Sequence, residues 1–198
     1  MDKEKELEKL NKKMLACTKC ALRSGCKQVV PGEGSASVRI MFIGEGPGAK
    51  EDELGRPFVG AAGKFLDEML GIIKLKREDV YIANTVKCRP PNNRDPLPEE
   101  KENCWPWLEA QVKLIKPELI VTLGRHSLEE FLPGQKISEV HGKALRRDFP
   151  GIGEAGRQVF FALYHPAAAL YNGSMREVLI KDFKKIPKVL KIIDEEKG

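Results

Sequence analysis

The sequence predicts an α/β fold with a mainly parallel sheet, and three observations lead to that prediction. Four short apolar runs, at residues 38–43, 80–83, 119–123 and 159–163, have the length and composition of buried strands. Apolar residues at helical spacing recur between these runs, so strands and helices alternate along the chain. The runs offer no polar face, and we therefore expect helices on both sides of the sheet.

The first half of the chain carries two predicted helices. A charged amphipathic helix is predicted at 2–15, followed by a loop rich in Cys, Gly and Lys at 17–34. After the first strand, apolar residues at helical spacing predict a helix at 61–73. The second strand leads into a polar segment at 88–96, where Pro, Asn and Asp favour a rigid loop.

The second half carries three more helices and one variable stretch. A helix is predicted at 98–115, with a kink or a late start because it contains a proline, and a short helix at 125–132. The glycine-rich stretch 135–157 is a candidate hairpin. The final helix, 175–193, also contains a proline, which limits its regularity.

Length and composition indicate one globular domain spanning 1–198, since 41% of the residues are hydrophobic and 32% are charged. No run approaches about 18 apolar residues, and the charged N-terminus lacks the apolar core of a signal peptide. We therefore expect a cytoplasmic protein with no membrane segment. The net charge of +5 favours a polyanionic partner.

The cysteines suggest a metal or cluster site. Cys17 and Cys20 form a C-x2-C pair, Cys88 and Cys104 lie further along, and Cys26 stands apart from the pattern. An odd number of cysteines in an intracellular protein favours ligands over disulfides. Soft thiolates suit zinc or an iron–sulfur cluster, and the second pair lacks the short spacing of structural zinc sites. The simpler alternative is that these are small core residues.

Polar residues follow all four predicted strands. The turn 44–48, with the sequence G-E-G-P-G, follows the first strand, Asn84 the second, 124–126 the third and His165 the fourth. Ligands of parallel sheets bind beyond the carboxyl ends of the strands. Each feature alone has an ordinary alternative, as a turn, a cap or a structural histidine. Their convergence at one edge predicts an active site.

The loops near this edge add weaker signals. Phe58 lies in a Gly- and Pro-framed loop, where it would serve as a packing lid or as a platform for a planar base. The acidic run 51–53 is expected to be a solvated loop. Cations of the polar segment would bind backbone phosphates or remain simply solvated: Lys87, Arg89 and Arg94.

Together these motifs identify a family resemblance. The chain carries, in order, C-T-K-C, G-E-G-P-G-x-x-E-D, G-R-P-F-V-G-x-A-G, N-T-V-K-C-R-P-P-N-N-R and H-P-A-A-A-L. This set closely resembles the thermostable iron–sulfur uracil-DNA glycosylases, family 4 of the uracil-DNA glycosylase superfamily. The resemblance runs from Cys17 to about Lys185 and implies a three-layer α/β/α sandwich around a central four-stranded, mainly parallel sheet.

The resemblance also implies a cofactor and its place in the fold. A [4Fe–4S] cluster would order loops near the DNA and hold the N-terminal helix and Cys loop, residues 1–34, on the rest of the domain. Its ligands would be Cys17, Cys20, Cys88 and Cys104.

The implied activity is that of a monofunctional uracil-DNA glycosylase. Such an enzyme flips uracil out of DNA and hydrolyses its N-glycosidic bond, leaving an abasic site and initiating base excision repair. By resemblance Phe58 would stack on the uracil, Asn84 would bind its polar edge, and His165 would donate toward O2. The first motif would line the pocket through Glu45, Gly46 and Glu51.

One departure from family 1 of the superfamily bears on the mechanism. There an aspartate positions the attacking water and a tyrosine excludes thymine, at the positions of Gly46 and Gly48 here. Water activation therefore falls to Glu45 or Glu51, and other groups, Glu51 among them, must exclude thymine. The basic insertion that lets a related subgroup link covalently to DNA is not evident between residues 124 and 143, so we expect no covalent trapping.

The expected partner is uracil-containing DNA, double- or single-stranded, bound by a prokaryotic-type monomer. Leu170 or Tyr171 would act as the wedge that fills the vacated base stack, and Arg89 and Arg94 would contact the backbone. A sliding clamp is a conceivable partner, but no motif for one is present. Two alternatives stay open: a non-catalytic nucleic-acid-binding module held by zinc, and a sibling enzyme acting on hypoxanthine or xanthine.

Overall fold

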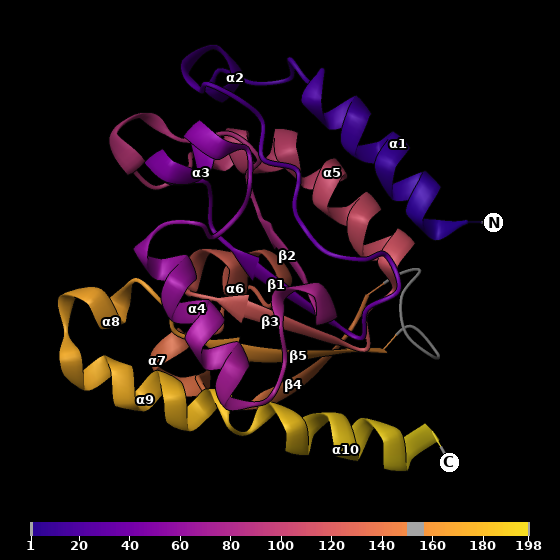
Figure 1. The fold of residues 1–198 in the computed structure, drawn as a ribbon, viewed down its shortest axis with the longest axis vertical. Coiled ribbons are helices and arrows are strands. Elements are labelled where there is room, and N and C mark those ends of the chain that lie inside the picture. The colour runs from indigo at the N-terminus through magenta and orange to yellow at the C-terminus, as the bar shows by residue number, and fades with distance from the viewer. Residues whose placement is uncertain (1, 150–156, 198) are drawn as a thin grey trace.

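A computed structural model describes residues 2–149 and 157–197. Its centre is one five-stranded sheet with the strand order β2-β1-β3-β5-β4 (Figure 1). The first four of these strands run parallel, and β4 is antiparallel to β5. The predicted α/β fold with a mainly parallel sheet is confirmed. The strands are β1 (Ile40–Gly44), β2 (Tyr81–Asn84), β3 (Leu119–Leu123), β4 (Ala144–Asp148) and β5 (Arg157–Leu163).

The fifth strand is the difference from the expected sheet of four. β4 reads A-L-R-R-D and is largely exposed, so it lacks the apolar signature that marks the other strands. It is held by its backbone pairing with β5, in which Leu145 lies opposite Phe160. Of the candidate hairpin at 135–157, the structure shows a short helix (Ile137–Val140) and β4, whose antiparallel partner β5 only begins at Arg157. Residues 150–156 lie outside the described part.

Alternating side chains of the strands divide the core into two layers. In β1, Ile40 and Phe42 face one helix layer, whereas Met41 and Ile43 face the other. The first layer consists of α4 (Ala61–Ile72), α9 (Gly173–Phe183) and α10 (Ile186–Lys197). The second consists of α5 (Pro98–Ile115), α6 (Arg125–Phe131) and α7 (Ile137–Val140), with α1 (Lys3–Leu15) lying along α5 (Figure 1).

Two proline predictions are corrected. The expected single helix at 175–193 is two helices, and Pro187 stands in the first turn of α10, where its missing N–H leaves no hydrogen bond unmade. The late start considered for the helix at 98–115 is wrong, because α5 begins at Pro98 and contains Pro106 in its interior.

The acidic run at 51–53 is part of a short helix, α3 (Ala49–Leu54), and not a solvated loop. Asp52 is buried, and its Oδ1 accepts hydrogen bonds from the backbone N–H groups of Lys27 and Gln28 at 2.8 and 3.3 Å. A carboxylate that satisfies loop N–H groups looks in the sequence like surface charge. The remaining short helical segments are α2 (Leu22–Gly25), η1 (Arg77–Asp79), η2 (Pro91–Asn93) and α8 (Ala168–Tyr171).

The sequence predicts no membrane segment, and the helices of the structure can be compared with this prediction. Within residues 2–149 and 157–197, no helix combines the length and apolarity needed to cross a bilayer.

Candidate active site

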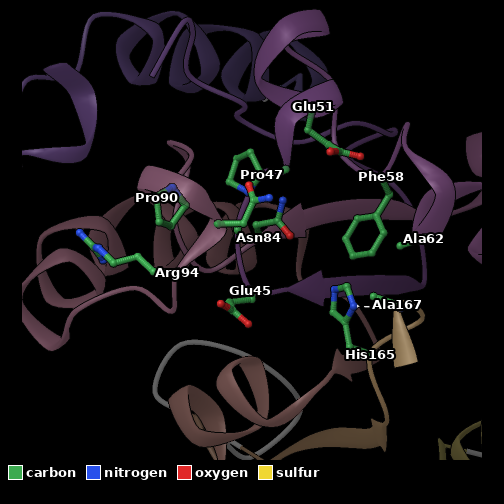
Figure 2. A pocket seen from close by; sticks show the side chains of 13 residues that line it. Glu45, Pro47, Glu51, Phe58, Ala62, Asn84, Pro90, Arg94, His165 and Ala167 are labelled. Carbon is green, nitrogen blue, oxygen red and sulfur yellow. Dashed lines mark hydrogen bonds between the residues drawn. The ribbon is translucent and has the colours of Figure 1, made fainter. Parts of the chain in front are cut away.

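A cavity of about 300 Å³ opens at the carboxyl edge of the sheet. It lies where parallel-sheet proteins bind their ligands, because the strands deliver their polar ends to one edge. Figure 2 shows side chains from the turn after β1, the end of β2 and the loop after β5 around this cavity. The six residues predicted for the pocket all line it: Glu45, Gly46, Glu51, Phe58, Asn84 and His165.

Asn84 offers the cavity an unused hydrogen-bond acceptor. It is the last residue of β2, pairs with Gly44 of β1, and is 2% exposed. Its side-chain Oδ1 is buried and has no hydrogen-bond partner among the described residues. A Cβ atom at Gly44 would lie 2.6 Å from both this oxygen and Phe58 Cζ, so only glycine leaves room for them. Buried polar atoms are normally paired, and an orphan in a cavity indicates a ligand group.

Phe58 is held in an unusual backbone conformation beside His165. Its φ is +50°, and its ring centroid lies 5.6 Å from that of His165 at an interplanar angle of 30°. Arg77 donates to the carbonyls of Phe58 and Pro57 at 3.0 and 2.6 Å, which fixes this turn from outside. A strained position persists where its surroundings over-determine it, so the ring is placed before any ligand arrives.

Glu51 connects α3 to the loop that carries Phe58. Its Oε1 accepts from the backbone N–H groups of Val59 and Gly60 at 2.8 and 2.7 Å. Two charge-assisted hydrogen bonds hold this carboxylate in one orientation at the cavity wall. The geometry makes Glu51 a positioning group for the Phe58 loop.

His165 is a neutral donor in this environment. Burial, partly offset by Glu51, lowers its pKa from 6.5 to about 4. Its Nδ1 accepts a hydrogen bond from the backbone N–H of Ala167 at 3.2 Å, so the proton of the neutral ring is on Nε2. At neutral pH the ring can therefore donate from Nε2 without carrying charge.

Glu45 faces a histidine and a second carboxylate, a contact that the sequence did not predict. His126, at the start of α6, places Nε2 at 3.6 Å from Glu45 Oε2 and 3.3 Å from Asp95 Oδ2. Burial raises the pKa of Glu45, with the nearby Asp95 adding to the rise and His126 opposing it. The only available signal was the position of Gly124-Arg125-His126 directly after the third predicted strand.

The residues predicted to contact DNA lie around the pocket with different surroundings. Arg94 lines the cavity, but its guanidinium points away from the other lining side chains (Figure 2) and forms two hydrogen bonds to Glu100, at 2.6 and 2.8 Å. Arg89 donates to Asn93. In α8, which follows His165 closely, Leu170 is 49% and Tyr171 90% exposed. The DNA contacts of these four residues stay predictions.

Lys87 does not fit the predicted phosphate contact. It is buried, and its Nζ donates to the Asn84 carbonyl at 2.9 Å and to Gln111 Oε1 at 2.7 Å. Burial lowers its pKa to about 8. The lysine that looks like loop charge in the sequence is an internal link between the sheet and α5.

All five cysteines meet at a second place, on the far side of Lys87. The four predicted ligands line a small cavity between the α1–α2 connection, the segment after β2 and α5. Trp107 Nε1 donates to Cys17 Sγ and the Lys87 N–H donates to Cys104 Sγ, each at 3.2 Å. Cys26 is not apart in space, because it lies beside Cys88 in the same apolar cluster.

The cysteine sulfurs are spaced widely for a single ion. No three of them, all within the described residues, lie within 4.8 Å of one another, whereas a tetrahedral zinc site needs sulfurs about 3.8 Å apart. Burial raises the pKa of the Cys88 and Cys104 thiols, so their thiolate forms need a cationic partner. This donor set suits a soft metal centre bound by thiolates.

Comparison with known proteins identifies the family of this chain. Residues 31–191 match the uracil DNA glycosylase superfamily. Type-4 uracil-DNA glycosylases of Sulfurisphaera tokodaii and Archaeoglobus fulgidus are each 46% identical over 186 residues, which is 91% of this chain and 83% and 91% of their own lengths. That of Thermotoga maritima is 42% identical over 191 residues, covering 96% of this chain and 97% of the relative. The chain therefore belongs to the uracil DNA glycosylase superfamily, and within it to the type-4 uracil-DNA glycosylases.

Proposed function

We propose that this protein is a monofunctional uracil-DNA glycosylase that initiates base excision repair. It flips uracil out of DNA and hydrolyses the N-glycosidic bond, leaving an abasic site. The observation that carries this proposal is the cavity at the carboxyl edge of the sheet, where the unpaired Asn84 Oδ1, the Phe58 ring and the neutral His165 converge. The relatives named above carry this activity in their names.

The base is selected by its imide edge. Asn84 Oδ1 accepts from the uracil N3–H, and its Nδ2 donates to O4, while the Phe58 ring stacks on the flipped base. Cytosine presents an acceptor at N3 and a donor at C4, so it opposes both groups. The buried Oδ1 that lacks a partner in the free protein would then remain unsatisfied, which penalises the wrong base.

Bond cleavage leaves negative charge on uracil and positive charge on the sugar. His165 Nε2–H donates to uracil O2 as the anion develops, and a neutral donor does not have to lose a proton for the product to leave. Of the two candidate carboxylates, Glu51 is engaged by the Phe58 loop, which leaves Glu45 to orient water or stabilise the sugar cation. Glu51 acts on substrate indirectly, by placing Phe58.

Cys17, Cys20, Cys88 and Cys104 would hold a [4Fe–4S] cluster. When bound, the cluster supplies a cross-link among thiolates and no step of the excision. The wide spacing of the sulfurs and the burial of Cys88 and Cys104 support this choice over zinc. The cross-link holds residues 1–34 against the rest of the chain, so that 1–198 forms one domain.

We further propose that the partner is uracil-containing DNA, and that the enzyme acts on it as a monomer in the cytoplasm of a prokaryote. Leu170 or Tyr171 enters the vacated stack, since both are exposed on α8 next to His165. Arg89 and Arg94 lie along the loop at 89–94 that borders the pocket. The Glu100 pair neutralises part of the charge of Arg94, so Arg89 supplies the stronger phosphate contact.

A single-turnover cleavage assay tests the proposal. Labelled oligonucleotides carry one uracil opposite G, opposite A or in a single strand, one thymine opposite G, or one hypoxanthine. Strand scission after alkali at uracil and not at thymine is the expected result. Scission at hypoxanthine alone would assign the sibling activity. No scission by protein that absorbs near 400 nm would contradict a glycosylase.

A further inference from the structure

Three side chains that were given no role in the predicted pocket meet next to Glu45. His126 Nε2 lies 3.6 Å from Glu45 Oε2 and 3.3 Å from Asp95 Oδ2. Arg125 donates from Nε to the same His126 nitrogen at 3.0 Å and pairs with Asp95 Oδ2 at 2.6 Å. Three segments far apart in the sequence, the turn after β1, the polar loop and the start of α6, thus converge on one imidazole nitrogen.

We propose that His126 is a positioning residue for Glu45: together with Asp95 it holds the Glu45 carboxylate at the edge of the pocket. The proposal rests on the proposed function for the meaning of Glu45 in catalysis. The contact itself belongs to the free protein and can be measured without substrate.

The geometry gives His126 a partner in both protonation states. As the neutral ring, Nε2 can accept the hydrogen bond from Arg125 Nε. As the imidazolium, Nε2–H can donate to Asp95 and attract Glu45, at distances in the ion-pair range. The ring is 18% exposed, so solvent screens these interactions only partly.

A divalent cation is the competing occupant of this group. The ligand atoms of Glu45, Asp95 and His126 all lie within 4.8 Å of one another. The guanidinium of Arg125, however, already contacts both His126 and Asp95, and a positive group there repels a cation. The arrangement therefore favours an imidazole held between two carboxylates.

The charges around Glu45 act in opposite directions. Burial raises its pKa and Asp95 adds to the rise, whereas His126, Arg125 and Lys101 of α5 lower it. Lys101 is itself paired with Glu130 at 2.7 Å, which weakens its effect at Glu45. Among the groups that lower the pKa of Glu45, His126 has the largest effect, so its removal should raise this pKa more than the loss of Arg125 or Lys101.

The backbone explains why His126 reaches this place. Gly124 directly follows β3 and caps the start of α6 with φ at +93°, a conformation that favours glycine. A Cβ atom there would lie 3.0 Å from His165 Cβ. One glycine thus brings His126 behind Glu45 while allowing His165 into the pocket.

The test uses three variants of the cluster-loaded protein: His126→Gln, Asp95→Asn and, as the matched control, Glu129→Gln. Glu129 is exposed on the same helix and is not among the charges that shift Glu45. The Glu45 carboxyl is followed by 13C NMR titration, with Glu45→Gln for assignment, and single-turnover excision is measured from pH 5 to 8. Circular dichroism verifies the fold of each variant.

We expect His126→Gln to raise the Glu45 titration midpoint by about one pH unit and Asp95→Asn to lower it, with the control unchanged. The acidic limb of the excision profile should move with the midpoint in each variant. The proposal is overturned if the Glu45 midpoint is the same in His126→Gln and Asp95→Asn as in the wild type. Slower excision without any shift of the midpoint also overturns it. Because Asp95 is 58% exposed, its variant remains informative if His126→Gln unfolds. A shifted midpoint in protein that excises no uracil refutes the proposed function but retains the contact.

Discussion

The pocket and the cysteine site are two regions built in opposite ways. The pocket takes Glu45, Asn84 and His165 from the carboxyl ends of parallel strands, so the sheet sets the distances among these three. The cysteine site joins the α1–α2 connection, the segment after β2 and α5, none of which is a strand of the sheet. The core of the protein thus positions these pocket residues. At the cysteine site, by contrast, the proposed cluster would itself hold together the segments that supply its ligands.

The two regions also differ in what they leave unsatisfied. In the pocket, Asn84 Oδ1 is an acceptor without a partner, and a substrate group can complete it. At the cysteines, burial raises the pKa of the Cys88 and Cys104 thiols, so a bound cationic group would favour their thiolate form. Under the proposed function, a transient substrate completes the pocket, whereas a resident cluster would complete the cysteine site. Substitutions should therefore damage chemistry in the first region and the fold in the second.

The largest effect should come from Cys88→Ala. Losing one of four thiolates should remove the absorbance near 400 nm and lower Tm by about 10 °C or more, because cluster binding contributes to folding. Absorbance and thermal unfolding are measured on protein purified without oxygen. The matched control is Cys26→Ala, an adjacent buried cysteine that is not in the proposed ligand set. Equal loss of colour in both variants would move Cys26 into the ligand set.

Asn84→Ala should have the largest effect on chemistry with the fold preserved. It removes the groups that bind the imide edge, and we expect single-turnover excision to fall about 10³-fold or more. The fold should tolerate the change, because the deleted Oδ1 makes no hydrogen bond among the described residues. Gln135→Ala, which truncates an exposed amide outside the pocket, is the control. An Asn84 variant that excises at the normal rate would remove Asn84 from the base-binding group.

The same contrast explains what the sequence could predict. The strands and the pocket residues at their ends follow from apolar runs with polar stops, as in Ile40–Gly44 followed by Glu45. β4 could not be found this way, since its residues are largely exposed and its pairing is with a partner beyond a loop. Lys87 was misjudged for a related reason, because burial of a charged residue depends on contacts with distant Gln111. A sequence pattern over a few residues shows which groups lie near one another along the chain. It does not show which residues from distant parts of the chain will pair with them.

His165→Ala tests the chemistry more narrowly. Deleting the donor to uracil O2 should slow the chemical step by about two to three orders of magnitude with little effect on substrate binding. His165→Gln retains an N–H donor and should recover part of the rate. A change confined to KM would contradict a role in the transition state.

The same residue predicts a pH dependence of stability. The unfolded chain binds the His165 proton near pH 6.5, but the folded protein binds it only near pH 4. Between these values the unfolded state holds more protons, so stability falls as the pH drops from 6.5 toward 4. Urea unfolding at pH 7 and pH 5 should show a smaller decrease in His165→Gln than in the wild type. Equal decreases would mean that His165 is not buried in its neutral form.

Lys87→Met should give the smallest of these effects, and it tests the connection between the two regions. Lys87 donates from Nζ to the Asn84 carbonyl and from its backbone N–H to Cys104 Sγ, so one residue touches both sites. Methionine keeps the backbone contact and much of the volume but leaves Gln111 Oε1 and the Asn84 carbonyl without their donor. We expect a loss of about 1–3 kcal/mol in the free energy of unfolding and about tenfold slower excision, with the absorbance near 400 nm retained. Slower excision with the colour intact would show that Lys87 acts on the pocket through Asn84. Loss of the colour would instead show that the Lys87 side chain supports the cysteine site, and the two regions would then have to be treated as one.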